Sequence, residues 1–269
     1  MTLRREHKLF LVAMAVLFVI AIAVISTGNV AYSIAVFCIF FVIMMGLSYL
    51  NYKNANRLED SQKALIFALA NLAEWRDPET GLHLERTRNY GVILAKELAK
   101  NPKYKNQIDK DFIDSIYHAA PLHDIGKVGI RDAVLLKEGR LTDEEYAEMR
   151  RHVVIAKNIL SEIIKKFGVA SRYLPVCLNI AAYHHEKYNG TGYAEGLKGD
   201  EIPLEARIYA LCDAYDAIRD RRPYKTEKSH EDAVSIILSE RGNGDKRCIS
   251  THCSFSHLTR LCPANRGRG

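Results

Sequence analysis

The chain has 269 residues, of which 48% are hydrophobic and 26% are charged, and its formal net charge is +6. This length suits one domain with appendages or two small domains. The positive charge is mild and no long basic run carries interleaved aromatic residues, which argues against a nucleic-acid polymer as ligand and leaves a small anionic ligand open.

Two apolar segments open the sequence. Residues 9–25 and 30–50 carry no charged side chain, and each is close to the ~20 helical residues that cross a hydrocarbon core. Only the residues STGN separate them, so we expect residues 1–50 to form a two-span transmembrane hairpin and not a cleaved signal peptide. Basic residues flank the hairpin, namely Arg4, Arg5, Lys8, Lys53 and Arg57. The positive-inside bias then predicts a multi-pass membrane protein with both termini in the cytoplasm.

Residues 51–63 are expected to form a linker helix into the cytoplasmic body. Leu58, Leu65, Leu69 and Leu72 recur at helical spacing. This stripe fits a homodimer seam and a first core helix of the body equally well.

Helical periodicity then recurs without an alternating strand or an internal repeat, so the body is expected to be all-α. The expected helices cover residues 84–100, 111–120, 143–166, 172–185, 204–219 and 230–240. Capping boxes mark two helix starts, TDEE at Thr142 and SHED at Ser229.

The tail, residues 242–269, differs from everything before it. Apolar periodicity stops there, and Cys, Arg, Ser and His become frequent. Translation in the wrong reading frame is the favoured interpretation, and a disordered extension is an alternative. A zinc knuckle is a third interpretation, but its candidate ligands lack the usual tight paired spacing. These ligands would be Cys248, Cys253, His257 and Cys262.

Histidines and carboxylates gather in five short motifs of the body. The motifs are DPETGLH with Glu79 and His83, PLHDIGKVGI with His123, Asp124 and Lys127, MRRHVV with His152, YHHEK with His184 and His185, and LCDAYDAI with Asp213 and Asp216. Each motif alone has an ordinary explanation, such as a surface pair or a hydrogen-bonded core histidine. Together these groups need a shared partner, because carboxylates on largely buried helices are costly when unpaired.

Divalent transition-metal ions would be that partner. Imidazole and carboxylate donors without thiolate suit iron, manganese or zinc. The donors outnumber the roughly four to six that one ion takes, so we expect two or more ions close together. Adjacent imidazoles at His184 and His185 fit such a cluster, and paired metal ions are suited to phosphoryl displacement.

In their order along the chain these motifs, with HHEKYNGTGY and RPYK, resemble the HD-GYP family. These are bacterial phosphodiesterases that degrade cyclic di-GMP, a branch of the HD metal-dependent phosphohydrolases. The resemblance covers about residues 64–241 and implies an HD-type helical catalytic domain there.

The resemblance also implies roles for individual residues. The implied metal ligands are Glu79, His83, His123, Asp124, His152, His184, His185 and Asp213. The implied catalytic residues are Lys127, at the scissile phosphate, and Asp124; the implied substrate contacts are Tyr193, Asp216, Arg222 and Lys225. Glu79 matches an acid that supports a third metal in some members. Two or three ions are therefore implied, iron with manganese as the alternative.

The sequence departs from the family pattern at two positions of the loop. Ala194 stands where proline is usual, which is expected to free the loop that presents Tyr193. Asn189 stands where aspartate is also common. The atypical tail also replaces a further apolar helix.

We therefore expect a membrane-anchored enzyme of the bacterial inner membrane that hydrolyses cyclic di-GMP to the linear dinucleotide, GMP or both. One alternative is a catalytically impaired nucleotide- and metal-binding module that signals through a partner such as a diguanylate cyclase domain. Another is a hydrolase of a different cyclic dinucleotide. Membrane lipid around the two spans and a second copy of the chain are the other expected partners.

Overall fold

The described part of the chain is entirely helical. The computed structural model describes residues 28–76, 82–168, 172–219 and 228–242, together with Val16, Phe18, Val19, Ile22, Ala23 and Ser26. Every regular element within these residues is an α-helix or a 3-10 helix, which confirms the expected all-α class. Contacts divide the chain into two units, Met1–Ser61 and Gln62–Gly269.

Helix α2 (Val30–Glu74) is the one helix in the described residues that is long and apolar enough to cross a membrane, judged by length and composition alone. It has 45 residues, so the second expected span and the expected linker at 51–63 form a single helix. Residues 9–25, the first expected span, lie mostly outside the described residues. The two-helix hairpin therefore stays a prediction, as do the three interpretations of the tail beyond residue 242.

The end of α2 has one buried face and one exposed face. Ile66, Ala70 and Ala73 are buried in the second unit. The leucine stripe is exposed instead, at Leu58, Leu65, Leu69 and Leu72. The end of α2 is therefore a core helix of the body, but the face that it buries is not the leucine stripe that suggested this interpretation.

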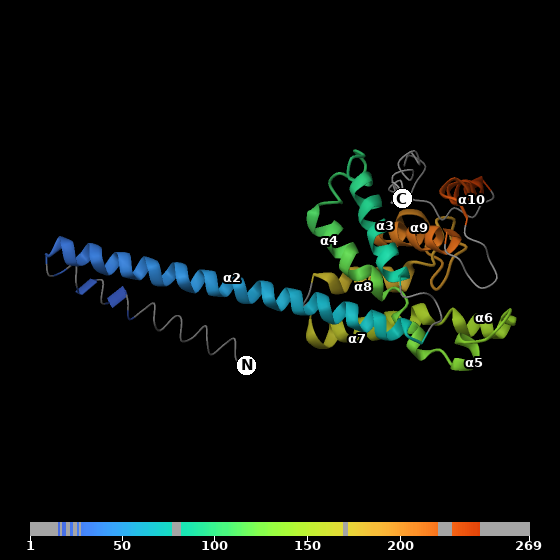
Figure 1. Cartoon of the computed structure of the whole chain (residues 1–269), viewed down its shortest axis with the longest axis horizontal. Helices are drawn as coiled ribbons and strands as arrows, with labels where there is room; N and C mark the ends of the chain where they lie inside the picture. The colour runs from blue at the N-terminus through green and yellow to red at the C-terminus, as the bar shows by residue number, and fades with distance from the viewer. Residues whose placement is uncertain are drawn as a thin grey trace, which may run out of the picture. The chain divides into compact units, whose positions relative to one another are not determined.

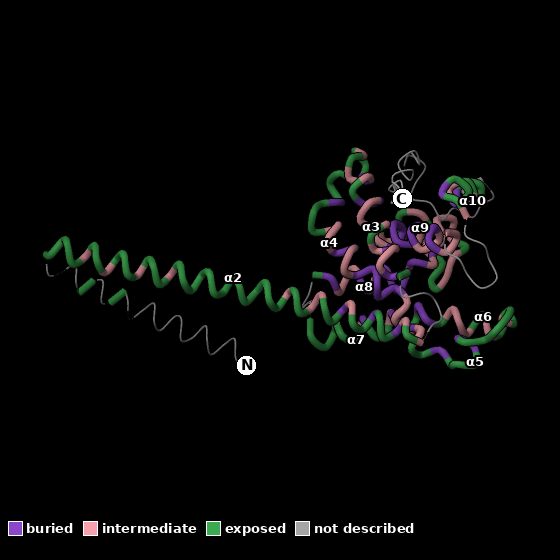
Figure 2. The backbone as a smooth tube through the Cα atoms, in the orientation of Figure 1, coloured by how far each residue is buried: buried purple, intermediate pink, exposed green. Residues whose placement is uncertain are grey.

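The remaining helices belong to the second unit (Figure 1). They are α3 (His83–Leu98), α4 (Lys110–Ala119), η1 (Ala120–Leu122), η2 (Ile125–Gly129), α5 (Asp132–Leu135), α6 (Asp143–Met149), α7 (His152–Phe167), α8 (Tyr173–Tyr183), η3 (Gly199–Glu201), α9 (Leu204–Arg219) and α10 (His230–Gly242). Helix α8 packs against α4, α7 and α9, and α9 also packs against α3 and α10. Figure 2 shows the resulting concentration of buried residues along α8 and α9.

Two apolar clusters make up most of the core, and α3 and α9 contribute to both. Ile116 and Ile208 lie in one cluster and Ile180 in the other, each fully buried. Burial of a side chain of this size is worth about 1.5–3 kcal/mol. Helices α3 and α9 are thus fixed from two sides, which holds any polar residue they carry in a defined position.

The single helix expected at 143–166 is wrong, because the structure has two helices there, α6 and α7. The capping box at Thr142 is confirmed as the start of α6. Helix α6 packs on α5, whereas α7 packs mainly on η2 and α8; Met149 of α6 and Ile155 of α7 share one small apolar cluster. The break between the two helices makes His152 the first residue of α7 instead of a mid-helix residue.

Arg76, two residues beyond the end of α2, contacts the segment from Val128 in η2 to Asp132 at the start of α5. Its guanidinium donates to the carbonyl oxygens of Val128 at 2.6 Å and Ile130 at 3.3 Å. It also pairs with Asp132 at 2.5 Å. Three contacts from one side chain therefore fix this segment, which directly follows Lys127.

Candidate metal centre

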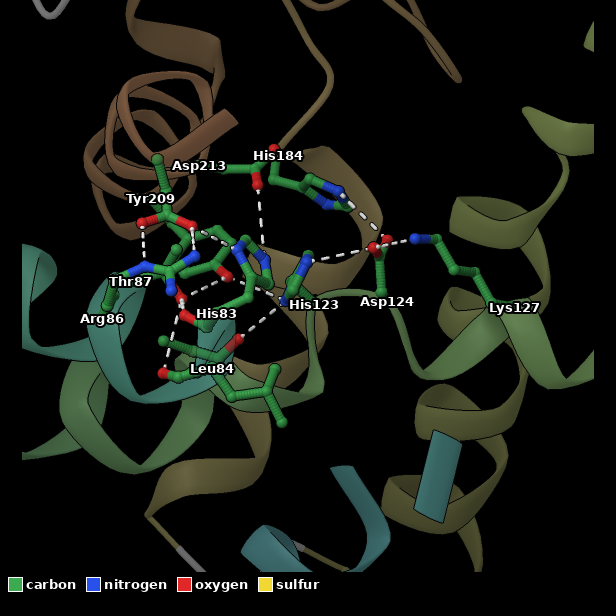
Figure 3. Close-up of polar contacts among 12 residues, drawn as sticks. His83, Leu84, Arg86, Thr87, His123, Asp124, Lys127, His184, Tyr209 and Asp213 are labelled. Carbon is green, nitrogen blue, oxygen red and sulfur yellow. Dashed lines mark hydrogen bonds and ion pairs between the residues drawn. The ribbon is translucent and has the colours of Figure 1, made fainter. Parts of the chain in front are cut away.

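The structure brings seven of the predicted metal-ligand residues into two neighbouring groups. The first group consists of Asp124, His152, His184 and His185, and the second group consists of His83, His123 and Asp213. Within each group the donor atoms all lie within 4.8 Å of one another. Figure 3 shows His83, His123, Asp124, His184 and Asp213 converging from different helices.

Asp124 lies between the two groups. Its Oδ1 is 3.2 Å from His152 Nε2 and 3.7 Å from His184 Nε2, both in the first group. Its Oδ2 is 3.1 Å from His123 Nε2, in the second group, and 2.7 Å from the ammonium of Lys127. One carboxylate oxygen therefore faces each group, which is the arrangement expected of a ligand shared by two ions.

Helix ends place these side chains. Pro121 has no N–H with which to continue α4, so the chain turns through η1 and presents His123 and Asp124. Gly126 then lets η2 approach α7, since a Cβ there would lie 1.9 Å from the carbonyl oxygen of His152. Helix α8 ends at Tyr183, which puts His184 at its C-cap and His185 just beyond.

The Nδ1 atoms of four imidazoles have hydrogen-bond partners. Those of His152 and His184 bond to the carbonyl oxygens of Met149 at 2.8 Å and Ile180 at 3.0 Å. A carbonyl only accepts, so these Nδ1 atoms carry the hydrogen and each Nε2 keeps its lone pair. His83 Nδ1 bonds to the carboxylate of Asp216 at 2.8 Å and favours the same tautomer.

A short relay holds His123. Its Nδ1 lies 2.8 Å from the Tyr209 hydroxyl, which donates to Thr87 Oγ1, which in turn donates to the carbonyl of His83 (Figure 3). The Tyr209 hydroxyl uses its hydrogen in the bond to Thr87, so it must accept from His123, and His123 Nδ1 is the donor. The Nε2 lone pair of His123 is thereby directed toward Asp124.

The donor set fits a cation. In the described part of the chain, His152 Nε2, His184 Nε2 and Asp124 Oδ1 are buried without a hydrogen-bond partner. All three are acceptors that face one another, so their lone pairs repel unless a positive charge lies between them. A divalent ion would satisfy all three at once, and imidazole with carboxylate suits a transition metal.

The charge states of the first group favour metal binding. Burial and the neighbouring His185 hold the pKa of His184 well below its usual value. Burial and His152 lower the pKa of His185 to about 4. Burial alone would raise the pKa of Asp124, but His123 and Lys127 outweigh it and hold that pKa below its ordinary range. At neutral pH His184 and His185 are therefore neutral and Asp124 is ionised, which are the forms that bind metal.

In the second group, the pKa of His123 is shifted in the opposite direction. Burial acts to lower the pKa of His123, but Asp124 beside it outweighs burial and the pKa is raised overall. In the metal-free protein His123 is therefore protonated at higher pH than His184 or His185.

Asp216 lies behind His83. Its carboxylate is 1% exposed and accepts from His83 Nδ1 and from two nitrogens of Arg86, at 2.7 and 2.8 Å. A substrate could reach this carboxylate only by displacing these partners, and the expected substrate contact stays a prediction. The bond to His83 Nδ1 is the kind that orients a metal-binding imidazole.

Tyr193 lies over the first group on a held loop. Its ring stacks on His185 with centroids 4.8 Å apart. Glu186 Oε1 accepts from the backbone N–H groups of Glu195 at 2.7 Å and Gly196 at 3.0 Å. These bonds restrain the loop that carries Ala194 in place of proline.

Gly192 allows the loop to lie close to its own base. A Cβ at this position would lie 2.3 Å from the backbone nitrogen of Lys187. Asn189 supports the turn by accepting from the backbone N–H of Thr191 at 3.0 Å. A residue other than glycine at position 192 would therefore push Tyr193 away from His185.

Three predicted residues, Glu79, Arg222 and Lys225, lie outside the described residues. Conversely, the sequence interpretation missed Arg86, Glu186 and Tyr209. Arg86 follows His83 by three positions, and Tyr209 precedes Asp213 by four, so each shares a helix face with a ligand. That spacing is the signal that could have identified both.

Comparison with known proteins gives one family match. Residues 67–246 match the family model described as HD domain. A protein named "Probable cyclic di-GMP phosphodiesterase" from Vibrio cholerae serotype O1 is 50% identical over 191 residues, which cover 71% of this chain and 43% of that protein.

Two further relatives are less similar. A "Cyclic di-GMP phosphodiesterase" from Thermotoga maritima is 40% identical over 184 residues, or 68% of this chain and 46% of the relative. A "3'3'-cGAMP-specific phosphodiesterase 2" from Vibrio cholerae is 35% identical over 198 residues, or 74% of this chain and 35% of the relative. The chain thus spans less than half the length of each of these relatives.

Proposed function

Because this chain belongs to the HD domain family, we propose that it is a metal-dependent phosphodiesterase of the HD-GYP branch that hydrolyses cyclic di-GMP. The product is the linear dinucleotide, GMP or both. One observation carries the proposal: two imidazole lone pairs and a carboxylate oxygen face one another in a buried site beside Lys127. The names of the relatives at 50% and 40% identity support the choice of substrate.

The two groups would each hold one ion, with Asp124 between them. The donor chemistry suits a divalent transition metal, and the resemblance to the HD-GYP family points to iron, with manganese as the alternative. Glu79 near His83 is the proposed support for a third ion. When bound, such ions supply an activated water and stabilise negative charge on the phosphate.

The protein's own residues position the substrate. Lys127, next to Asp124, places a positive charge where the scissile phosphate meets the centre. Tyr193 forms part of the substrate surface above His185, and Arg222 and Lys225 are proposed to bind phosphate or guanine. Asp216 is proposed to orient His83, and its contact with the substrate stays a prediction.

A second substrate deserves a direct comparison, because one relative is named for 3'3'-cGAMP. Both molecules are cyclic dinucleotides with two phosphodiesters. The same centre can therefore cleave either, and selectivity lies in the contacts to the bases.

We place the enzyme at the bacterial inner membrane through the apolar part of α2. The two-span topology with cytoplasmic termini, contact with membrane lipid, a homodimer through the leucine stripe and a diguanylate cyclase partner are parts of the same proposal. Protease protection of tagged termini in inverted membrane vesicles tests the topology.

The activity test uses the full chain in detergent, prepared without oxygen and reconstituted with Fe(II) or Mn(II). We expect metal-dependent loss of cyclic di-GMP with formation of linear dinucleotide or GMP, and slower loss of 3'3'-cGAMP. Less than one transition-metal ion per chain after reconstitution would contradict the proposal. Metal-loaded protein that binds cyclic di-GMP without cleaving it would favour the signalling-module alternative.

A further inference from the structure

Arg150 is an arginine held by aromatic rings at the edge of the metal centre. Its Cζ lies 4.3 Å from the centroid of the Tyr193 ring and 5.7 Å from that of Tyr146. Both contacts have the geometry of cation–π interactions, which hold a guanidinium by its face.

Most of the arginines that the structure describes in the second unit pair with a carboxylate instead. Ion pairs hold the guanidinium groups of Arg76, Arg86, Arg88, Arg131, Arg172 and Arg207. Arg150 has no carboxylate within ion-pair distance among the residues that the structure describes. Its N–H edges therefore remain available for an anion, and the paired donors of a guanidinium match a phosphate.

The position of Arg150 relates it to the ligands of the first group. It precedes His152 by two residues, and Tyr193, on which it lies, stacks on His185. Arg150 is thus separated from the ligand His185 by a single aromatic ring. Lys127, in contrast, contacts Asp124 directly. The site therefore has one cation at the reacting position and a second cation farther out.

A cyclic dinucleotide carries two phosphates on opposite sides of its ring, and the metal ions can take only one. We infer that Arg150 binds the second phosphate, the one that is not cleaved. The inference rests on the proposed function. Arg150 is then a specificity residue that selects substrates with two phosphates and adds binding energy distant from the bond that breaks.

The test compares two substrates in variants of the full chain. Cyclic di-GMP has two phosphates, whereas bis(4-nitrophenyl) phosphate has one and lacks the group that Arg150 would bind. Arg150→Met should raise KM for cyclic di-GMP about tenfold and leave kcat within about twofold, as expected for loss of one charge-assisted contact. The KM for the aryl phosphodiester and the metal content should not change.

Arg151→Met is the matched control, because it removes the same charge from the next, exposed residue. It should change neither KM. Arg150→Gln keeps a planar amide and provides the same comparison if the methionine variant does not fold.

Each other outcome is decisive. An unchanged KM for cyclic di-GMP would overturn the assignment, and so would an equal loss on both substrates, since Arg150 would then act by positioning Tyr193 or His185. Wild-type protein that cleaves the aryl phosphodiester but neither cyclic di-GMP nor 3'3'-cGAMP would overturn the proposed function itself.

Discussion

The two ligand groups differ in how their imidazoles are oriented. In the first group, His152 and His184 bond to backbone carbonyls three and four residues earlier in the chain. In the second group, His83 and His123 bond to Asp216 and Tyr209, which are side chains of α9. Local helix geometry thus orients the first group, whereas the second depends on the docking of a distant helix.

Because of this difference, different substitutions should disturb the imidazoles of the two groups. No substitution removes a backbone carbonyl, so the orientations of His152 and His184 should be robust to side-chain changes around them. The second group is sensitive to single polar substitutions on α9. Four predictions test this contrast, from the largest expected effect to the smallest.

Asp124 belongs to the first group but also faces His123 of the second, so its loss should affect both groups and remove the difference between them. We expect Asp124→Ala to lower kcat at least about a thousandfold, because a shared ligand and the partner of Lys127 disappear together. Bound metal, measured by elemental analysis, should fall in both groups. Asp143→Ala, an exposed carboxylate at the start of α6, is the control and should change neither quantity. Full metal content in Asp124→Ala would show that Asp124 is not shared.

Asp216→Asn should weaken the second group alone. Loss of an outer carboxylate typically costs ten- to a hundredfold in metal affinity or activity. Chelator competition should then show one weakened ion and one unchanged ion. The matched change in the first group is Ile180→Val, which keeps the carbonyl that bonds to His184. It should cost about 1 kcal/mol of stability and leave metal affinity unchanged. Equal weakening of both ions in Asp216→Asn would contradict the separation of the groups.

The metal-free protein should lose stability as pH falls below about 6.5. The pKa values of His184 and His185 are lowered in the folded state. At a pH between the folded and the unfolded pKa of each histidine, the unfolded chain binds more protons than the folded protein, so unfolding becomes easier. For His185, with a pKa of about 4, the loss between pH 7.5 and pH 5 is on the order of 1–2 kcal/mol.

His123 acts in the opposite direction. Its pKa is raised, so its contribution is present below its unfolded pKa and is lost as pH rises through the folded pKa. Urea unfolding at pH 5 and pH 7.5 measures the sum, and His185→Ala should show a smaller difference between the two pH values. If the metal-free protein were more stable at pH 5 than at pH 7.5, His123 and not His184 and His185 would dominate the pH dependence of stability.

Tyr209→Phe should produce the smallest effect. The hydroxyl that holds His123 disappears, but the carbonyl of Ala120, 3.2 Å from His123 Nδ1, remains as a second acceptor. We expect activity to fall about three- to tenfold, with the second ion weakened slightly. Tyr215→Phe is the control. It removes another hydroxyl of α9, one that bonds to His230 and not to a residue of the candidate metal centre, and it should leave activity unchanged. A hundredfold loss in Tyr209→Phe would mean that Ala120 does not support His123.

The residues of the two groups could be predicted from the sequence as candidate ligands because each lies in a short motif of polar residues on an apolar background. Their supporting residues could not, because partner choice depends on tertiary structure. His83 and Asp216 are 133 residues apart, and Tyr209 and His123 are 86 apart. Helix spacing marks Tyr209 and Arg86 as neighbours of ligands but does not say which imidazole each one contacts.

The helices of the body were largely predictable from apolar periodicity, and α9 matches its expected bounds of 204–219. The break between α6 and α7 was not, because Arg150 and Arg151 are good helix formers and carry no stop signal. In the structure α6 contacts α5, whereas α7 contacts mainly η2 and α8, and these tertiary contacts leave no mark in the local sequence. The same break puts His152 at a helix start, where its Nδ1 reaches the carbonyl of Met149.

The three contacts of Arg76 have a thermodynamic consequence. The side chain of Arg76, just beyond the end of α2, bonds to the backbone that follows Lys127, so the conformations of these two segments are coupled. Any ligand that steadies the segment after Lys127 must also steady the end of α2. By reciprocity, a change that displaces the end of α2 should in turn alter the affinity for that ligand.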